Sequence, residues 1–119
     1  MNMTTLHRVE LEPSDIKVKV VFNGKVVAHT ERALVVRETG YPDVYYLPEA
    51  DLRPEFFEDS ARKTHCPYKG EARYMHLVDG DSRAEDAVWT YPDPIPGVEG
   101  LAGHVAFYRD RVDSIGVER

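Results

Sequence analysis

The sequence has little cysteine and no long apolar run: its 119 residues include one cysteine, Cys66. A single cysteine cannot form an intrachain disulfide and excludes a four-cysteine zinc site. The five histidines are scattered along the chain without the short spacing that is typical of metal ligands. No apolar run approaches the roughly 20 residues of a membrane-spanning helix. We therefore expect no metal site, no cofactor and no membrane association.

Positive charge is also scarce. The chain has 15 lysines and arginines against 21 aspartates and glutamates, which gives a net charge of −6. Proteins that bind nucleic acid are usually basic, so we expect no nucleic-acid partner. Residues 1–7 lack the basic head and apolar core of a secretory signal, and we expect them to form a loose tail in a cytoplasmic protein. The length predicts a single domain over residues 1–119.

Alternation of apolar and polar residues is the main pattern that the chain does have. Residues 16–22 alternate, and Asn23-Gly24 is the strongest short signal for a β-hairpin with a return strand over 25–30. Further strands are predicted at 33–38, 44–47, 72–78, 86–91 and 104–108, with a weaker edge strand at 8–12 and short helical turns after Pro48 and within 98–103. We treat the polar stretch before residue 72 as a connection. The pattern predicts an antiparallel all-β domain with one or two short helical turns.

Several segments match a known pattern: Val26-Val27-Ala28, residues 33–38, Gly40-Tyr41-Pro42 with Val44-Tyr45-Tyr46, residues 64–70 (Thr-His-Cys-Pro-Tyr-Lys-Gly), residues 87–91 and residues 103–108. Through them the chain resembles the small bacterial family known as domain of unknown function 427, over about residues 8–113. The resemblance implies a β-tent fold, in which two antiparallel sheets lean together. It implies no established activity.

A basic island lies at residues 62–76, between acidic stretches at 49–59 and 79–99. It holds two lysines and two arginines against Glu71 alone. Such an island can recognise an anion, or it can simply pair with the acidic neighbours. The sequence leaves both interpretations open.

Cys66 lies inside this island, close in sequence to His65 and Lys69. Neighbouring cations favour the thiolate, which is the nucleophilic form of cysteine, so Cys66 is a candidate catalytic residue. Pro67 and Gly70 favour a tight turn that would present the sulfur and Lys69 to one cleft. The alternative is structural, because a free cysteine is often buried as a small apolar side chain.

Glu38 and the aromatic residues are the remaining candidates. Glu38 ends an apolar strand, where it is either a buried carboxylate paired with Lys69 or an arginine, or a solvated charge. Trp89 and Tyr91 lie two residues apart and therefore share one face of a strand, whereas Tyr45 and Tyr46 face opposite sides. Aromatic side chains with polar tips suit the wall of a mixed pocket, although a core role is the common one.

These features predict a module that binds a small molecule or an anion in a cleft around residues 66–70. The predicted ligand-binding residues are Glu38, Tyr46, Cys66, Lys69, Trp89 and Tyr91. Two alternatives remain open. One is a thiol-dependent enzyme that uses Cys66, and the other is a homodimeric interaction module that associates through exposed strand edges.

Overall fold

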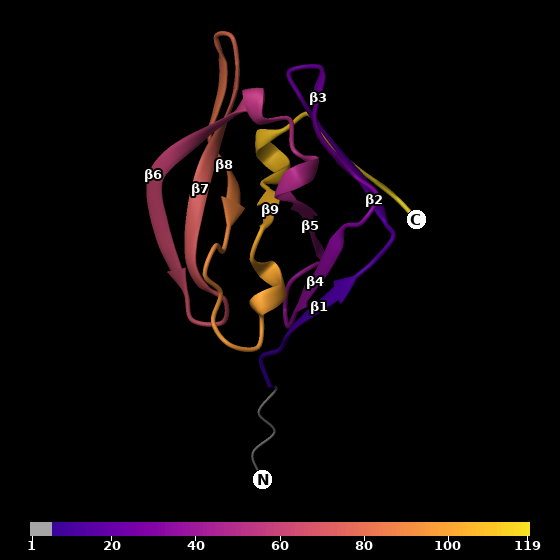
Figure 1. The fold of residues 1–119 in the computed structure, drawn as a ribbon, viewed down its shortest axis with the longest axis vertical. Helices are drawn as coiled ribbons and strands as arrows, with labels where there is room; N and C mark the ends of the chain where they lie inside the picture. The colour runs from indigo at the N-terminus through magenta and orange to yellow at the C-terminus, as the bar shows by residue number, and fades with distance from the viewer. Residues whose placement is uncertain (1–5) are drawn as a thin grey trace.

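The computed structural model describes residues 6–119, which form two antiparallel sheets (Figure 1). The seven-stranded sheet has the order β1-β4-β5-β9-β8-β7-β6, formed by β1 (Val9–Pro13), β4 (Leu34–Glu38), β5 (Val44–Pro48), β9 (His104–Phe107), β8 (Ser82–Thr90), β7 (Gly70–Asp79) and β6 (Phe57–Cys66). The three-stranded sheet has the order β10-β2-β3, formed by β10 (Ser114–Glu118), β2 (Lys17–Phe22) and β3 (Lys25–Thr30). Four short 3₁₀ turns complete the fold: η1 (Glu49–Asp51), η2 (Pro54–Phe56), η3 (Glu99–Leu101) and η4 (Arg109–Arg111).

The predicted all-β class and the pair of antiparallel sheets are confirmed. The hairpin at Asn23-Gly24 joins β2 to β3, and both residues have positive φ angles, 52° and 75°, as a type I′ turn requires. The described residues hold four 3₁₀ turns rather than one or two, and η1 and η3 lie where helical turns were expected. Within residues 6–119 no helix combines the length and hydropathy that a membrane span needs.

The pattern analysis missed two strands, β6 and β10. The polar stretch before residue 72 is not only a connection, because residues 57–66 form a ten-residue strand at the edge of the large sheet. Most side chains of β6 are exposed, so burial imposes no regular alternation on the sequence. β10 is also an edge strand, and only Ile115 in it is partly buried. Both strands form because their backbones hydrogen-bond to a neighbouring strand. The order of apolar and polar side chains in the sequence does not indicate this backbone pairing.

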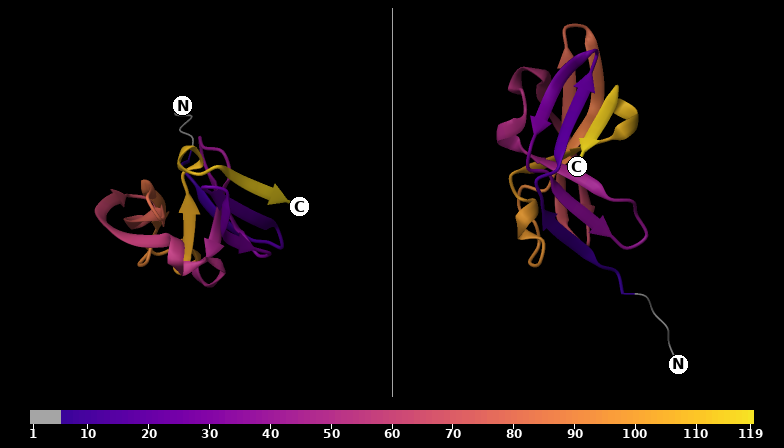
Figure 2. Two further views of the ribbon diagram at one scale, coloured as in Figure 1. Left: turned by 90° about the horizontal axis from the view of Figure 1, so that it is seen from above. Right: turned by 90° about the vertical axis from the view of Figure 1, so that its right-hand side faces the viewer.

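The core has two parts, one on each face of the large sheet. The first cluster packs the small sheet against the large one through residues such as Val18, Val20 and Val27 on one side and Leu77, Val88 and Val105 on the other. The second cluster covers the opposite face with Val36, Tyr46, Tyr74, Tyr91, Leu101 and Ala106. Adjacent residues such as Tyr46 and Leu47 enter different clusters because side chains alternate along a strand. The views of Figure 2 show the small sheet lying across the large one.

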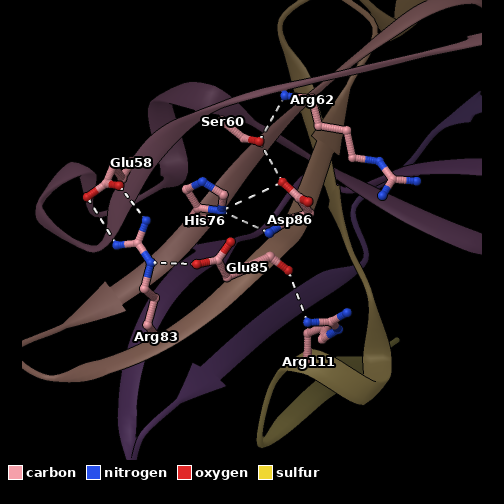
Figure 3. Close-up of polar contacts among 8 residues, drawn as sticks. All are labelled: Glu58, Ser60, Arg62, His76, Arg83, Glu85, Asp86 and Arg111. Atoms are coloured by element: carbon pink, nitrogen blue, oxygen red, sulfur yellow. Dashed lines mark hydrogen bonds and ion pairs between the residues drawn. The ribbon is translucent and has the colours of Figure 1, made fainter.

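Three neighbouring strands are irregular at the same level. The pairing of β6 with β7 shifts between Asp59 and Lys63, and the pairing of β7 with β8 shifts between Met75 and Leu77. Figure 3 shows Ser60, His76 and Asp86 pointing toward one another there, one from each strand. The Ser60 hydroxyl donates to Oδ1 of Asp86 at 2.5 Å, and the backbone N–H of Asp86 donates to Nδ1 of His76 at 3.0 Å. The bond to His76 gives the backbone N–H of Asp86 a partner where the ladder is interrupted, and the bond from Ser60 joins two side chains across it.

The expected N-terminal tail falls partly outside the described residues, because residues 1–5 are not described. His7 is described and is half-buried. Its ring stacks on Tyr68 with a centroid distance of 3.7 Å, and its Nε2 lies 2.9 Å from Oε2 of Glu38. Residue 7 therefore contacts the folded domain.

Candidate functional site

The turn from Cys66 to Gly70 directs Lys69 into the molecule. The backbone N–H of Lys69 donates to the oxygen of Cys66 at 3.2 Å, and the Lys69 oxygen accepts from the N–H of Ile95 at 3.0 Å. Gly70 has a φ of +120°, and a Cβ atom there would lie 3.3 Å from the backbone oxygen of Asp93. The turn and the proline-rich loop after β8 thus hold each other in place. As a result the Lys69 residue is only 8% exposed.

The buried Lys69 ammonium pairs with the Glu38 carboxylate at the end of β4. Nζ of Lys69 donates to Oε1 of Glu38, while Nε2 of His7 lies against Oε2. Burial by itself raises the pKa of the Glu38 carboxyl, but the hydrogen bonds and charges of Lys69 and His7 outweigh burial and hold this pKa below its usual value. The predicted pairing of Glu38 with Lys69 is present, and Glu38 is not a solvated strand end.

Aromatic side chains from β5 and β8 stand next to this ion pair. Trp89 and Tyr46 meet edge to face, with ring centroids 6.1 Å apart at 87°. The indole Nε1–H of Trp89 donates to the Tyr46 hydroxyl at 2.9 Å. On its other side Trp89 lies 4.5 Å from the ring of Tyr108. Trp89 is itself only partly buried, so it combines packing with an accessible surface.

The two buried tyrosine hydroxyls have raised pKa values. Removal from water raises the pKa of Tyr46 and that of Tyr91, and the nearby Glu38 carboxylate raises both further. Cys66 packs against the same core cluster as these two tyrosines. Both phenols therefore remain protonated and able to donate a hydrogen bond at neutral pH.

These groups surround a pocket of about 300 Å³. It is lined by Val36, Glu38, Tyr41, Pro42, Val44, Tyr46, Lys69, Tyr74, Trp89, Tyr91 and Tyr108. The volume lies at the lower end of the range for small-molecule sites, and the lining is mainly apolar and aromatic with one charged pair. The structure thus brings five of the six predicted ligand-binding residues together, from β4, β5, the 66–70 turn, and β8 with the residue that follows it.

Cys66 is the predicted residue that does not line this pocket. It ends β6, is partly buried, and packs against the second core cluster. Its place as a candidate nucleophile remains a prediction.

Sequence reasoning missed several residues at the site, including Tyr41, Tyr74 and Tyr108. Tyr74 shares a strand face with Ala72, so the alternation in 72–78 could have placed it in the core beside the predicted residues. Tyr41 follows a glycine in a turn, and Tyr108 comes just after β9. Nothing in their local sequence indicates that these two loops meet over one pocket.

The basic island is largely engaged in contacts with its surroundings. The Arg62 guanidinium lies 5.0 Å from the ring centroid of Tyr74, and Arg73 pairs with Glu71 at 2.8 Å. Lys69 is buried against Glu38. Within residues 6–119 no group of three or more His, Cys, Asp or Glu side chains is arranged to bind a metal ion.

A larger hollow of about 830 Å³ lies on the other face of the β7–β8 hairpin. Its apolar lining includes Leu52, Phe57 and Met75, which pack against the first core cluster. Its charged residues are Glu49, Asp59 and Arg73, and all three are exposed. Because none of its charged groups is buried and held in place, this hollow lacks the fixed polar anchors of the aromatic pocket.

A protein-family model described as Domain of unknown function (DUF427) matches residues 10–118. The match begins in β1 and ends with β10, so it includes both sheets and every residue that lines the aromatic pocket. No curated protein matches the chain. The resemblance noted in the sequence is confirmed.

Proposed function

The chain belongs to the DUF427 family, which has no assigned function, and we propose that it acts as a small-molecule-binding module. The proposed site is the pocket between Lys69, Glu38 and the aromatic side chains of β5 and β8. One observation carries the proposal: a buried ion pair stands beside a partly accessible tryptophan in a pocket of about 300 Å³. An apolar pocket with a few convergent polar groups is the usual form of a ligand site.

The ion pair supports a binding role because it is costly as a purely structural feature. Taking two charges out of water costs several kcal/mol per ion, and the attraction between them often does no more than offset this. Well-packed apolar residues would stabilise the same position at least equally well. A fixed charge at the wall of a pocket, in contrast, is useful for orienting a ligand.

The proposal is tested by a fragment screen with two-dimensional amide NMR. Trp89 is the only tryptophan, so its indole N–H gives a single signal that reports directly on the pocket. We expect hits to shift this signal together with the backbone signals of Tyr46 and Lys69. Lys63→Met is the control variant, because Lys63 is an exposed lysine of the same basic island. The hits should shift the same signals in this variant as in the parent protein.

Two results would contradict the proposal. Hits that shift Phe57 and Met75 and leave the indole unmoved would assign binding to the larger hollow. A screen in which no fragment moves the Trp89 signal would remove the support for this site altogether.

The same sample examines the two alternatives. Alkylation of Cys66 at neutral pH that is much faster than that of a free thiol would favour a thiol enzyme. A mass in solution of twice 13.6 kDa would favour the homodimeric module.

A further inference from the structure

The aromatic pocket is lined by a buried ammonium group that has unused hydrogen-bond donors. An ammonium group carries three N–H donors and accepts nothing. Within residues 6–119, Nζ of Lys69 contacts only Oε1 of Glu38, so two of its three donors have no protein partner there. A lysine that is 8% exposed cannot turn these donors freely to bulk water.

The tyrosines add two further donors. The Tyr46 oxygen accepts from the Trp89 indole, which leaves its own O–H available. Tyr91 is 7% exposed and makes no hydrogen bond within the described part of the chain. Among the described residues, every side-chain N or O atom that is fully buried has a hydrogen-bond partner. The Tyr91 hydroxyl has none, so it is partly exposed, and Tyr91 lines the pocket. Both phenols are protonated at neutral pH, since the ordinary pKa of tyrosine is about 10 and burial raises it further.

The only strong acceptor in the pocket is already engaged. Oε1 of Glu38 accepts from Lys69, and Oε2 lies against Nε2 of His7. A ligand that brings N–H donors or a positive charge would compete with Lys69 for the same carboxylate. A ligand that brings acceptor oxygens would meet unused donors instead.

We propose that this pocket selects a small ligand that joins a planar ring to a carboxylate. The inference rests on the proposed function, since it assigns a ligand class to the same site. The carboxylate accepts hydrogen bonds from Lys69 and Tyr91 without displacing Glu38. The ring packs among the aromatic side chains of Trp89, Tyr46 and Tyr108, where offset and edge-to-face contacts are favourable.

Three probes that share a phenyl ring and nearly the same shape test this inference. Benzoate, benzamide and benzamidinium differ mainly in whether the head group is an anion, a neutral amide or a cation. Binding is followed by the fluorescence of Trp89, excited at a wavelength that the probes do not absorb. We expect benzoate to bind at least about tenfold more tightly than benzamide, because hydrogen bonds to a charged donor and acceptor are about twice as strong as neutral ones. Benzamidinium should bind most weakly.

The double variant Glu38→Gln/Lys69→Met shows whether the ion pair causes this order. It removes both charges together and leaves no buried charge unpaired, so it should fold. We expect this variant to bind benzoate and benzamide with about equal affinity. Lys63→Met should keep the preference of the parent protein.

The possible failures are distinguishable. If benzamidinium binds as tightly as benzoate, or if the double variant keeps the preference, the assigned ligand class is wrong while the pocket remains a binding site. If none of the three probes changes the Trp89 signal and the fragment screen also fails there, both the inference and the proposed function are overturned.

Discussion

Lys69 and Glu38 show what a single pair of residues contributes to this protein. Each is held in place by its own backbone segment, Lys69 by the turn that ends at Gly70 and Glu38 by the end of β4. The two side chains meet where their charges are shielded from water, with 10% and 14% of their side-chain surface exposed. At this scale stability depends on keeping both partners, because either charge alone is left poorly solvated.

Lys69→Met should therefore destabilise the protein by about 3 kcal/mol, since it leaves the Glu38 carboxylate with His7 as its remaining partner. Glu38→Gln/Lys69→Met should recover most of this loss, because no buried charge is left unpaired. Urea denaturation measures both free energies of unfolding. A single variant as stable as the parent would mean that water reaches Glu38 freely.

The lowered pKa of Glu38 predicts how stability changes in acid. A carboxyl with a lower pKa in the folded state than in the unfolded state stabilises the fold above its unfolded pKa, and this contribution is lost as the pH falls through the folded pKa. Below about pH 5 the free energy of unfolding of the parent should thus decrease more steeply than that of Glu38→Gln. Denaturation series from pH 7 to pH 3 compare the two slopes. Equal slopes would show that Glu38 does not contribute.

At the scale of elements, the irregular region of β6, β7 and β8 is held by side chains that replace ladder hydrogen bonds. Asp86 has a φ of 52°, a left-handed conformation that costs most residues 1–3 kcal/mol and that Asp and Asn tolerate best. The Asp86 carboxylate also accepts from Ser60. Nearby, Arg83 bridges Glu58 and Glu85 across the strands, and Nη1 of Arg111 donates to the backbone oxygen of Glu85 at 3.1 Å (Figure 3).

Asp86→Ala should cost about 2 kcal/mol, because it loses the bond from Ser60 and places a residue that disfavours positive φ at this position. Asp86→Asn should cost less than about 1 kcal/mol, since asparagine tolerates the same φ and retains an acceptor oxygen. Thermal and urea unfolding measure the difference. If the two variants are equally stable, neither the φ angle nor the Ser60 contact matters at this site.

At the scale of the whole molecule, the two sheets share the first core cluster. Val18, Val20 and Val27 of the small sheet lie in this cluster together with Leu77, Val88 and Val105 of the large sheet. The second cluster, which includes Tyr46 and Tyr91, is formed by strands whose opposite face packs in the first cluster. The pocket and the small sheet are on opposite sides of the large sheet, yet they depend on the same strands.

Val20→Ala should therefore destabilise the whole molecule, pocket included, by about 2 kcal/mol, because two buried methyl groups are lost. Unfolding of a domain of this size is expected to be two-state, so Trp89 fluorescence and circular dichroism should give coincident transitions that shift together. Val117→Ala is the control, since Val117 is 37% exposed and should change stability by less than about 0.5 kcal/mol. A Trp89 transition unaffected by Val20→Ala would show that the sheets unfold independently.

The features that depend on local pattern could be predicted from the amino-acid sequence. Alternation placed β2, its β-branched residues placed β4, and Asn23-Gly24 placed the first hairpin and with it the return strand β3. The same alternation separated Tyr45 from Tyr46 and joined Trp89 to Tyr91. Together with the family resemblance, these features were enough to predict the all-β fold and five of the residues that line the pocket.

The features that depend on contacts between distant segments became visible in the folded chain. β6 and β10 are strands because a neighbour pairs with them, and exposed edge strands carry little alternation. Tyr41 and Tyr108 line the pocket because two loops 67 residues apart meet there, and no local preference encodes that meeting. Lys69 lines the pocket and Cys66 does not, because the 66–70 turn packs on the proline-rich loop and directs Lys69 inward. Burial and long-range pairing are properties of the folded chain. They show which of the alternatives left open by the sequence applies, such as a buried and not a solvated Glu38.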